Sequence, residues 1–450
     1  MKKFFRTRVV NMLSNLSRRT LSKYDPVVIA VTGNIGKTTT KDYIYSFLNT
    51  KNSQNQEDFV RASQKSENSE FGMNLTILGE KNPWNSATGW FKIILRNFLN
   101  LYRTKKYPKV LVLEVGADKP GDIKFLTSII KPDLVVLTAF QQAPTHGEFF
   151  TSVEQHINEK KILVERMKKD GVIVYNADDE VMSKIAEEKK LKSPKIEIFS
   201  FGQKTDTNIS ILENTNLYNE EADIIGTKIK LGINFKNFSD EIELRILDVV
   251  GEAQAYSVAA AVCVAILNNF KKEDLLNVVR NFERNFILSK SRMRILQGVL
   301  DSTIIDDSYN SSPKASLNAI ETVSKILSKG KKIAVLGHMA ELGEKTKQEH
   351  IKVAELAAKF FDIIIFSGRY NEFYLEGVRN AKTDLSKVFL AKDSNDVLKI
   401  MSENDLIREN DLILIKGSQS ARLEKVVVEL LVNPRDREEV CRQDKEWVNR

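Results

Sequence analysis

Cysteine is almost missing from this chain, and long hydrophobic runs are missing altogether. The 450 residues include two cysteines, Cys263 and Cys441, which are far apart and form no C-x-x-C pair. This excludes a disulfide framework and a zinc ribbon, and it fits a reducing cytoplasm. No apolar run approaches the roughly 18 residues that a membrane span needs. Arg, Asn and Ser interrupt the N-terminal stretch where a signal peptide needs an apolar core. We therefore expect a cytoplasmic protein.

Acidic residues are absent from residues 1–24, although the chain has 60 of them against 68 Lys and Arg. The segment carries seven basic residues, and apolar residues recur in it at helical spacing: Phe5, Val9, Met12, Leu13 and Leu16. We predict a basic amphipathic helix. Such a helix either makes a peripheral contact with an anionic membrane or packs its apolar stripe on the following domain, and the sequence leaves both open. No nucleic-acid partner is expected, because the remaining charge is nearly balanced and no aromatic-basic platform occurs.

Short apolar runs alternate with amphipathic stretches from residue 27 onward, which is typical of a parallel sheet with crossover helices. We predict an α/β domain over 25–285 with strands at 27–31, 110–113, 134–137 and 172–175. Alternating apolar residues between 196 and 248 predict a small antiparallel insertion beside that sheet. A second, Rossmann-like domain is predicted over 286–432, entered through a linker at 285–298, with strands at 304–305, 333–336, 363–366, 388–390 and 412–415. Residues 433–450 form a polar tail, expected as a surface helix or a disordered end.

The sequence TGNIGKTTT at 32–40 lies between the first predicted strand and a helix. Backbone N–H groups at such a junction face an anion, and glycines let it approach closely. Lys37 is suited to the β- and γ-phosphates, and the Thr38 hydroxyl to Mg²⁺. Val31 stands where the usual pattern has one more glycine. We predict a phosphate-binding loop formed by Gly33, Asn34, Ile35, Gly36, Lys37, Thr38 and Thr39.

Other candidate residues follow later strands or lie on the next helix. Glu114 ends the strand at 110–113, where a carboxylate points into the ligand crevice of a parallel sheet and could bind Mg²⁺. His146 lies in a loop after the third strand, and Lys160 lies beside Lys161 on the predicted helix at 153–168. Taken singly, Glu114 is equally well a charge at the edge of the sheet, and His146, Lys160 and Lys161 are more typical of solvated surface residues.

Together with these motifs, further segments resemble the Mur ligase family in order and spacing. They are ENSEFGMNLTILG (67–79), LEVGADKPGDI (113–123), PTHGEFF (144–150), EKKIL (159–163), YNADD (175–179), IIDDSYNSSP (304–313), LGHMAELGE (336–344) and IKGSQS (415–420). The resemblance covers about residues 25–432. It implies an ATP- and Mg²⁺-dependent amide ligase that forms an acyl-phosphate, with a UDP-linked or lipid-linked muramoyl peptide and D-alanyl-D-alanine as substrates.

The resemblance also implies residue roles. Thr38 and Glu114 would hold one Mg²⁺ and His146 another, while Lys160 matches the lysine that the family carbamylates, with Lys161 as the alternative if the register differs by one. Arg292 matches an arginine that reaches ATP after domain closure, and Asp307 a nucleotide-contacting aspartate. Near the amine substrate would lie Asn310, Lys416 and Ser418, and Asn176 and Asp178 are weaker candidates at a strand end.

Departures from the family pattern concern the start of the chain and a few site positions. Only about 25 residues precede the first strand, so we expect the family's N-terminal UDP-binding domain to be missing. Ser257 replaces an adenine-contacting asparagine, His338 an aspartate and Ser291 a glycine. Two alternatives therefore stay open beside D-alanyl-D-alanine addition: a relative that amidates another carboxylate, such as a lipid-linked muropeptide or poly-γ-glutamate, and a non-catalytic nucleotide-binding scaffold.

Overall fold

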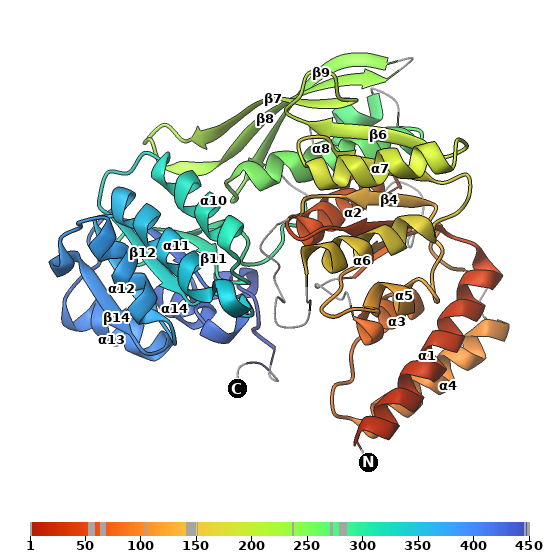
Figure 1. Ribbon diagram of the computed structural model, residues 1–450, viewed down its shortest axis with the longest axis horizontal. Coiled ribbons are helices and arrows are strands. Elements are labelled where there is room, and N and C mark those ends of the chain that lie inside the picture. Colours follow the sequence, from red (N-terminus) through yellow and green to blue (C-terminus); the bar gives the residue numbers. More distant parts are fainter. Residues whose placement is uncertain are drawn as a thin grey trace.

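The chain builds two α/β domains, each on its own sheet (Figure 1). The computed structural model describes residues 2–52, 59–63, 69–103, 106–140, 150, 152–235, 238–270, 273–278, 286–444 and 447. The predicted fold class, a parallel sheet with an antiparallel insertion followed by a second α/β domain, is confirmed. The two domains face each other across a cleft, with the antiparallel strands spanning above it in the view of Figure 1.

The first sheet has nine strands in the order β2-β3-β1-β4-β5-β6-β7-β8-β9, parallel from β2 to β7 and antiparallel from there to β9. Their bounds are β1 Val27–Thr32, β2 Val60–Ala62, β3 Val110–Glu114, β4 Leu134–Leu137, β5 Val172–Asn176, β6 Glu197–Gly202, β7 Ile209–Tyr218, β8 Ile224–Phe235 and β9 Phe238–Leu247. The chain runs from β1 to β3 on one side and to β4 on the other, so strand order reverses at β1. Ligands of open α/β sheets bind at such a switch point, beyond the carboxyl ends of the strands.

Helices cover both faces of this sheet because β1 is apolar on both: Ile29 and Val31 face one core, Val28 and Ala30 the other. The first core contains α2 and the alanine-rich α8, and the second contains α3, α5, α6 and α7. The bounds of these helices are α2 Lys37–Asn52, α3 Glu70–Leu78, α5 Asp122–Leu126, α6 Val153–Glu165, α7 Glu180–Lys192 and α8 Glu252–Leu267.

The second sheet has the order β10-β11-β15-β12-β13-β14, parallel except for the β10–β11 pair. Its strands are β10 Arg294–Gln297, β11 Thr303–Asp307, β12 Lys332–Gly337, β13 Ile363–Ser367, β14 Val388–Ala391 and β15 Leu412–Lys416. Its helices are α10 Pro313–Ser324, α11 Thr346–Phe360, α12 Asn371–Asn380, α13 Ser394–Glu403 and α14 Glu424–Leu430. Apolar cores lie on both faces of this sheet too.

The antiparallel strands connect the domains. Ile224 and Val250 belong to a core of the second domain, Lys329 forms an ion pair with Asp223 at 2.7 Å, and the Leu327 N–H donates to the Tyr218 hydroxyl at 3.1 Å. The insertion therefore does more than extend the first sheet, because its far end is a docking point for the second domain.

The predicted N-terminal helix is present as α1, Lys2–Tyr24. Val9, Leu13 and Leu16 are buried in a small core with α3 and with α4, Ala87–Arg103, whereas Phe5 and Met12 are about half exposed. Most of the predicted apolar stripe is thus used in packing, which is the second of the two interpretations offered by the sequence. Among the described residues, no helix is long and apolar enough to cross a membrane.

Two expectations about irregular segments need correction. The linker predicted at 285–298 contains a strand, β10, which pairs with β11. The C-terminal tail is neither a free surface helix nor disordered where it is described: after a 3-10 helix, Pro434–Glu439, it buries Val440 and Cys441 against the second domain. The Cys441 N–H donates to the Ser291 hydroxyl at 2.9 Å, so the tail is held beside the interdomain segment.

Candidate active site

The loop after β1 is held from behind by the end of β4. The Asn34 and Ile35 N–H groups both donate to the Ala139 carbonyl, at 2.6 and 3.4 Å, and the Thr138 hydroxyl donates to the Ile35 carbonyl at 2.7 Å. Gly33 and Gly36 have φ values of +151° and +82°, which favour glycine. These contacts shape the backbone into the turn from which α2 starts at Lys37.

Replacing Gly33 by alanine is expected to destabilise the protein by about 1–3 kcal/mol and to weaken nucleotide binding at least about tenfold. A Cβ at Gly33 would lie 2.0 Å from the Thr138 hydroxyl oxygen and 3.0 Å from the Ala139 carbonyl oxygen. Calorimetric titration with ADP and thermal melting would measure both effects. Gly121→Ala is the matched control, because Gly121 also has a positive φ but nothing within 4 Å of its Cβ position; equal losses in the two variants would contradict the clash.

Three predicted residues meet at the start of α2. The Thr38 hydroxyl donates to the buried Glu114 carboxylate at 2.9 Å, and Lys37 Nζ donates to the Asn34 carbonyl at 3.3 Å. Burial lowers the pKa of Lys37, Glu114 and Asp118 oppose that shift, and Arg292 adds to it. The cluster sets cationic and anionic groups close together at the carboxyl ends of β1 and β3, as a phosphate and metal site requires.

Lys160 is buried on α6, and the charge of Lys37 affects its pKa. Burial first, and then the charge of Lys37, lower its pKa to about 7. Its neighbour Glu159 accepts from the Gly121 and Ile123 N–H groups at 2.7 and 3.1 Å, which fixes α6 against the turn before α5. Lys161 instead pairs with Glu188 on the exterior at 2.8 Å. Of the two lysines, Lys160 is therefore the buried one whose pKa is affected by the charge of Lys37.

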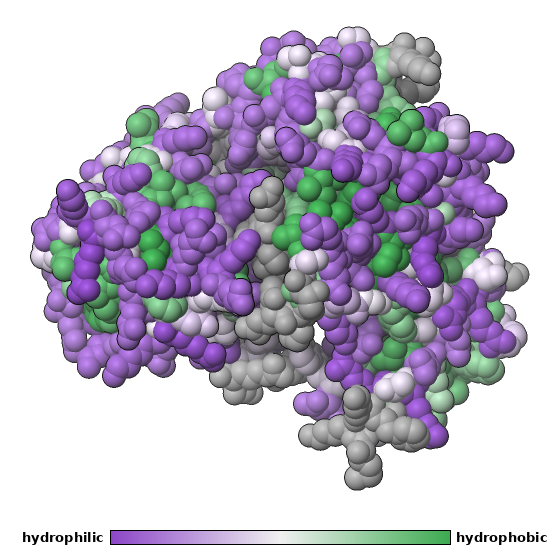
Figure 2. All heavy atoms as spheres, viewed as in Figure 1, coloured by the Kyte–Doolittle hydropathy of each residue, from purple (hydrophilic) through white to green (hydrophobic). Residues whose placement is uncertain are grey.

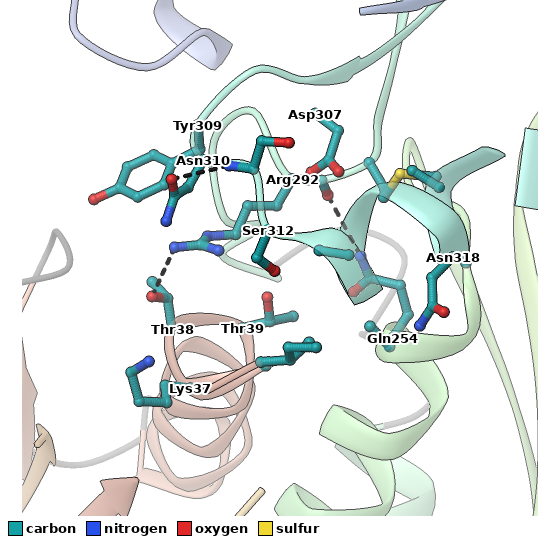
Figure 3. A pocket seen from close by; sticks show the side chains of 18 of the residues that line it. Lys37, Thr38, Thr39, Gln254, Arg292, Asp307, Tyr309, Asn310, Ser312 and Asn318 are labelled. Carbon is teal, nitrogen blue, oxygen red and sulfur yellow. Dashed lines mark hydrogen bonds between the residues drawn. The ribbon is translucent and has the colours of Figure 1, made fainter. Parts of the chain in front are cut away.

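The second domain faces this cluster with residues at the ends of β11 and β15. Arg292 Nη2 donates to the Thr38 hydroxyl at 3.1 Å, across the cleft (Figure 3). Asp307 accepts from the buried Lys416 at 2.5 Å, and Lys416 also donates to the Asn310 carbonyl at 3.0 Å. All four residues line one cleft with the phosphate-binding loop.

Of the described candidate residues, Gly33, Lys160 and Ser418 do not line this cleft. Ser418 is buried behind it, with its N–H donating to the His338 carbonyl at 3.2 Å and its hydroxyl 3.1 Å from that of Ser420. It does not appear among the residues that line the cleft. His146 lies outside the described residues, so its place in the site stays a prediction.

A second cleft continues from the first, beside β5 and α8. It is lined among others by Asn176, Asp178, Tyr256 and Ser257. The Tyr256 hydroxyl donates to Asp178 at 2.9 Å, and the Thr40 hydroxyl donates to Ser257 at 3.1 Å. Ser257 thus contacts the helix that follows the loop.

The described C-terminal tail supports the loop that carries Asn310. The buried Arg442 side chain donates to the Ser308 carbonyl at 3.3 Å and to the Tyr309 carbonyl. The guanidinium groups of Arg292 and Arg442 lie over the Tyr309 ring, with their central carbons 4.3 and 5.1 Å from the ring centroid. The tail therefore helps to place both the loop and the arginine that reaches Thr38.

Replacing Arg442 by alanine is expected to cost about 2–4 kcal/mol of stability, because it removes one partner of the buried Glu424. Turnover should also fall severalfold as the loop loosens. Thermal melting and steady-state kinetics would measure these effects. Arg435→Ala, an exposed arginine of the same tail, is the control and should change neither; equal behaviour of both variants would show that the tail does not support the loop.

Comparison with known families agrees with this geometry. The family model of the Mur ligase middle domain matches residues 31–265, and that of the Mur ligase glutamate ligase domain matches residues 291–419. The chain is a Mur ligase. The two matches cover the phosphate-binding loop and the residues that face it from the second domain.

Similar proteins include the UDP-N-acetylmuramoyl-tripeptide–D-alanyl-D-alanine ligase of Bacillus subtilis, 25% identical over 94% of this chain and 79% of that protein. The enzyme of the same name from Buchnera aphidicola is 26% identical over 90% of this chain and 75% of its own. Among solved structures, MurF from Acinetobacter baumannii has a TM-score of 0.70 at 21% identity, over 93% of this chain and 79% of that one. MurF of Thermotoga maritima, solved with ADP, has a TM-score of 0.67 at 22% identity, over 93% of this chain and 82% of that one.

The donor atoms of this Mur ligase fit Mg²⁺. Thr38 and Glu114 offer a hydroxyl and a carboxylate oxygen side by side, and Mg²⁺ is commonly held by one or two such protein oxygens together with substrate phosphates and water. In the described part of the chain, no group of three or more His, Cys, Asp or Glu side chains could hold a metal ion. Thr38 and Glu114 are therefore the described candidates for the Mg²⁺ ligands.

Sequence reasoning missed three residues of this Mur ligase site. The charge of Asp118 acts on both Lys37 and Lys160, and it lies inside the motif at 113–123, where it could have been noticed. The Tyr309 ring lies under the guanidinium groups of Arg292 and Arg442. Gln254 accepts from the buried Tyr43 hydroxyl at 2.6 Å and lines the cleft. Tyr309 also lies inside a quoted motif, the one at 304–313, whereas Gln254 has no signal in the sequence, since its role depends on contacts between distant segments.

Proposed function

We propose that this Mur ligase uses ATP to join D-alanyl-D-alanine to UDP-N-acetylmuramoyl-tripeptide in the synthesis of peptidoglycan precursors. The observation that carries the proposal is the meeting of two half-sites, Lys37, Thr38 and Glu114 from one domain and Arg292 from the other. Relatives that bear this activity in their names align over about nine-tenths of the chain.

The chemistry requires activation because a carboxylate is a poor electrophile. The terminal carboxylate of the tripeptide attacks the γ-phosphorus of ATP, which gives an acyl-phosphate and ADP. The amine of D-alanyl-D-alanine then attacks the acyl carbon, a tetrahedral intermediate forms, and inorganic phosphate leaves with the amine proton released to a base or to water. The first step brings two anions together and the second develops negative charge on the acyl oxygen, so fixed cations in the cleft lower both barriers.

Residue roles follow from position. We assign Lys37 and the backbone of Gly33, Asn34, Ile35, Gly36, Thr38 and Thr39 to the phosphates, and Arg292 to the phosphoryl group in transfer. Thr38 and Glu114 would hold Mg²⁺, which supplies charge neutralisation between the phosphates and the carboxylate. Asp307 is assigned to the nucleotide, Asn310 and Lys416 to the incoming amine substrate, and His146 and Lys160, the latter carbamylated, to a second Mg²⁺.

The deciding experiment measures phosphate release from ATP by the full chain with Mg²⁺, bicarbonate, UDP-N-acetylmuramoyl-tripeptide and D-alanyl-D-alanine, with mass spectrometry of the product. We expect release that requires both substrates and yields the pentapeptide. ADP binding without turnover of UDP-N-acetylmuramoyl-tripeptide and D-alanyl-D-alanine would reject this substrate assignment. Turnover on a lipid-linked muropeptide or on poly-γ-glutamate would then establish that the enzyme amidates another carboxylate. Failure on every carboxylate would leave the non-catalytic nucleotide-binding scaffold as the remaining alternative.

A further inference from the structure

Helix α4 is apolar on two sides, and one of them faces solvent. Trp90 and Ile93 are buried against α1 and α3. A second stripe follows the spacing i, i+4, i+7, i+11, which keeps it on one face of the helix. It consists of Phe91, Leu95, Phe98 and Tyr102, with exposed fractions of 66, 46, 44 and 71%. Four large apolar side chains in one exposed row are unusual on a soluble domain and mark a surface that binds something apolar.

The exposed row lies in a strongly basic environment. Residues 81–103 contain four Lys and Arg and no acidic residue, and residues 1–24 contain seven and none. Exposed cations on the two helices include Arg8, Arg18, Arg19, Lys92 and Arg103. Two carboxylates lie nearby, and both are engaged: Glu70 pairs with Arg6 and Glu80 with Arg96. The local field of α1 and α4 is therefore positive.

Helices α1 and α4 pack side by side along the free edge of the first domain, away from the cleft (Figure 1). Hydrophobic side chains appear among hydrophilic ones at the lower right of Figure 2, where α4 lies. Because this edge is far from the phosphate-binding loop, an occupant there would leave the entrance of the cleft open.

We propose that the exposed faces of α4 and α1 dock this protein on an anionic lipid surface, with Phe91, Leu95, Phe98 and Tyr102 entering the interface. A helix with aromatic and aliphatic residues on one face and Lys or Arg around it lies in the plane of a membrane in this way. The 17 residues of α4 lie along the surface and do not cross it. The membrane contact is thus made chiefly by α4. Helix α1 contributes positive charge and packs against the buried side of α4.

A second copy of the chain is the competing occupant, and the charges argue against it. In a symmetric dimer, the same patch would meet itself, and cations of α1 and α4 would face cations with no acidic residue in either segment to pair with them. An anionic headgroup layer supplies the missing opposite charge, at about 1 kcal/mol per Lys or Arg near the surface.

Sedimentation of the full chain with vesicles tests the proposal. We expect binding to vesicles of phosphatidylcholine with about a third phosphatidylglycerol, much weaker binding to phosphatidylcholine alone, and release as salt rises from roughly 0.05 to 0.5 M. The double variant Phe91→Ser/Phe98→Ser should bind at least about tenfold less, and Lys92→Glu/Arg103→Glu should lose binding similarly.

Matched controls replace equally exposed residues on other parts of the molecule. Leu191→Ser/Leu327→Ser removes two apolar residues that are 80 and 66% exposed, and Lys359→Glu/Lys387→Glu reverses two exposed charges of the second domain. Both should bind vesicles as the unaltered protein does, and all four variants should keep its ATP turnover. Absence of binding to anionic vesicles, equal loss in the controls, or a dimer abolished by Phe91→Ser/Phe98→Ser would overturn the proposal.

Discussion

Replacing Lys37 by methionine is expected to lower turnover by about a hundred- to a thousandfold, the usual cost of removing one electrostatic contact to a transition state. Methionine keeps the length of the side chain, so the loop and the start of α2 should persist. What disappears is the cation that lies between Glu114, Asp118 and the phosphate-binding turn. Arg292 cannot replace it, because it approaches from the opposite domain and already contacts Thr38.

Phosphate release with both substrates would measure the loss, and calorimetric titration with ADP would separate binding from chemistry. Lys161→Met is the control: this lysine pairs with Glu188 on the exterior, so its loss should leave turnover within about twofold, as for most exposed ion pairs. A Lys37→Met enzyme that kept more than a tenth of the original rate would contradict the assignment of Lys37 to the phosphates.

The buried strands could be predicted closely from the sequence, because each is an apolar run bounded by polar residues. The strand expected at 134–137 coincides with β4, and those at 27–31 and 110–113 differ from β1 and β3 by one residue. Strand β10 was missed since four residues at an antiparallel edge, with an arginine first, carry little periodicity. Helix α4 was missed although its two apolar stripes are plain in the sequence.

The choice between Lys160 and Lys161 could also have been made from the sequence. The buried positions of α6 are His156, Glu159, Lys160, Leu163 and Val164, which is the i, i+3, i+4, i+7 pattern of one helix face. Lys161 lies about 100° away from Lys160 on that helix. The family resemblance named the motif, but helix phase decides which lysine faces the core.

The contacts of the second half-site could not be predicted, because they join segments far apart in the chain. Ser418 lies in a motif that resembles the family, yet its hydrogen bonds hold it behind the cleft. Arg442 stands in a charged tail that has no helical pattern, and it contacts Tyr309 more than 130 residues away. A motif gives the type of residue at a position, while the direction of a side chain depends on packing.

Replacing Lys160 by methionine is expected to have two effects of opposite sign: the protein becomes more stable, and turnover falls at least about a hundredfold. The loss of turnover follows from the proposed role, since methionine cannot become a carbamate. The gain in stability follows from burial. The pKa of Lys160 is about 7 in the folded chain and near 10.4 when unfolded, so at neutral pH folding must either bury an ammonium group or release its proton.

The sign of the pH dependence distinguishes this cause from simple packing. Because the folded pKa is lowered, the penalty is absent above about pH 10.4, grows as pH falls, and is complete below about pH 7, where it is on the order of 5 kcal/mol. The difference in melting temperature between Lys160→Met and the unaltered protein should therefore be largest near pH 7 and shrink toward pH 9.5, in buffers freed of carbon dioxide.

Adding bicarbonate should reduce the difference in melting temperature between Lys160→Met and the unaltered protein, because a carbamate replaces the buried cation of the unaltered protein with an anion beside Lys37. The neutral amine, which attacks carbon dioxide to form the carbamate, is present near pH 7 only because burial and Lys37 lower the pKa of Lys160; an exposed lysine would be almost fully protonated there. Calorimetry at three pH values, with and without bicarbonate, measures both shifts. A Lys160→Met protein that melts lower than the unaltered one at pH 7, or that still turns over, would show that Lys160 is a packed structural residue and not part of the reaction.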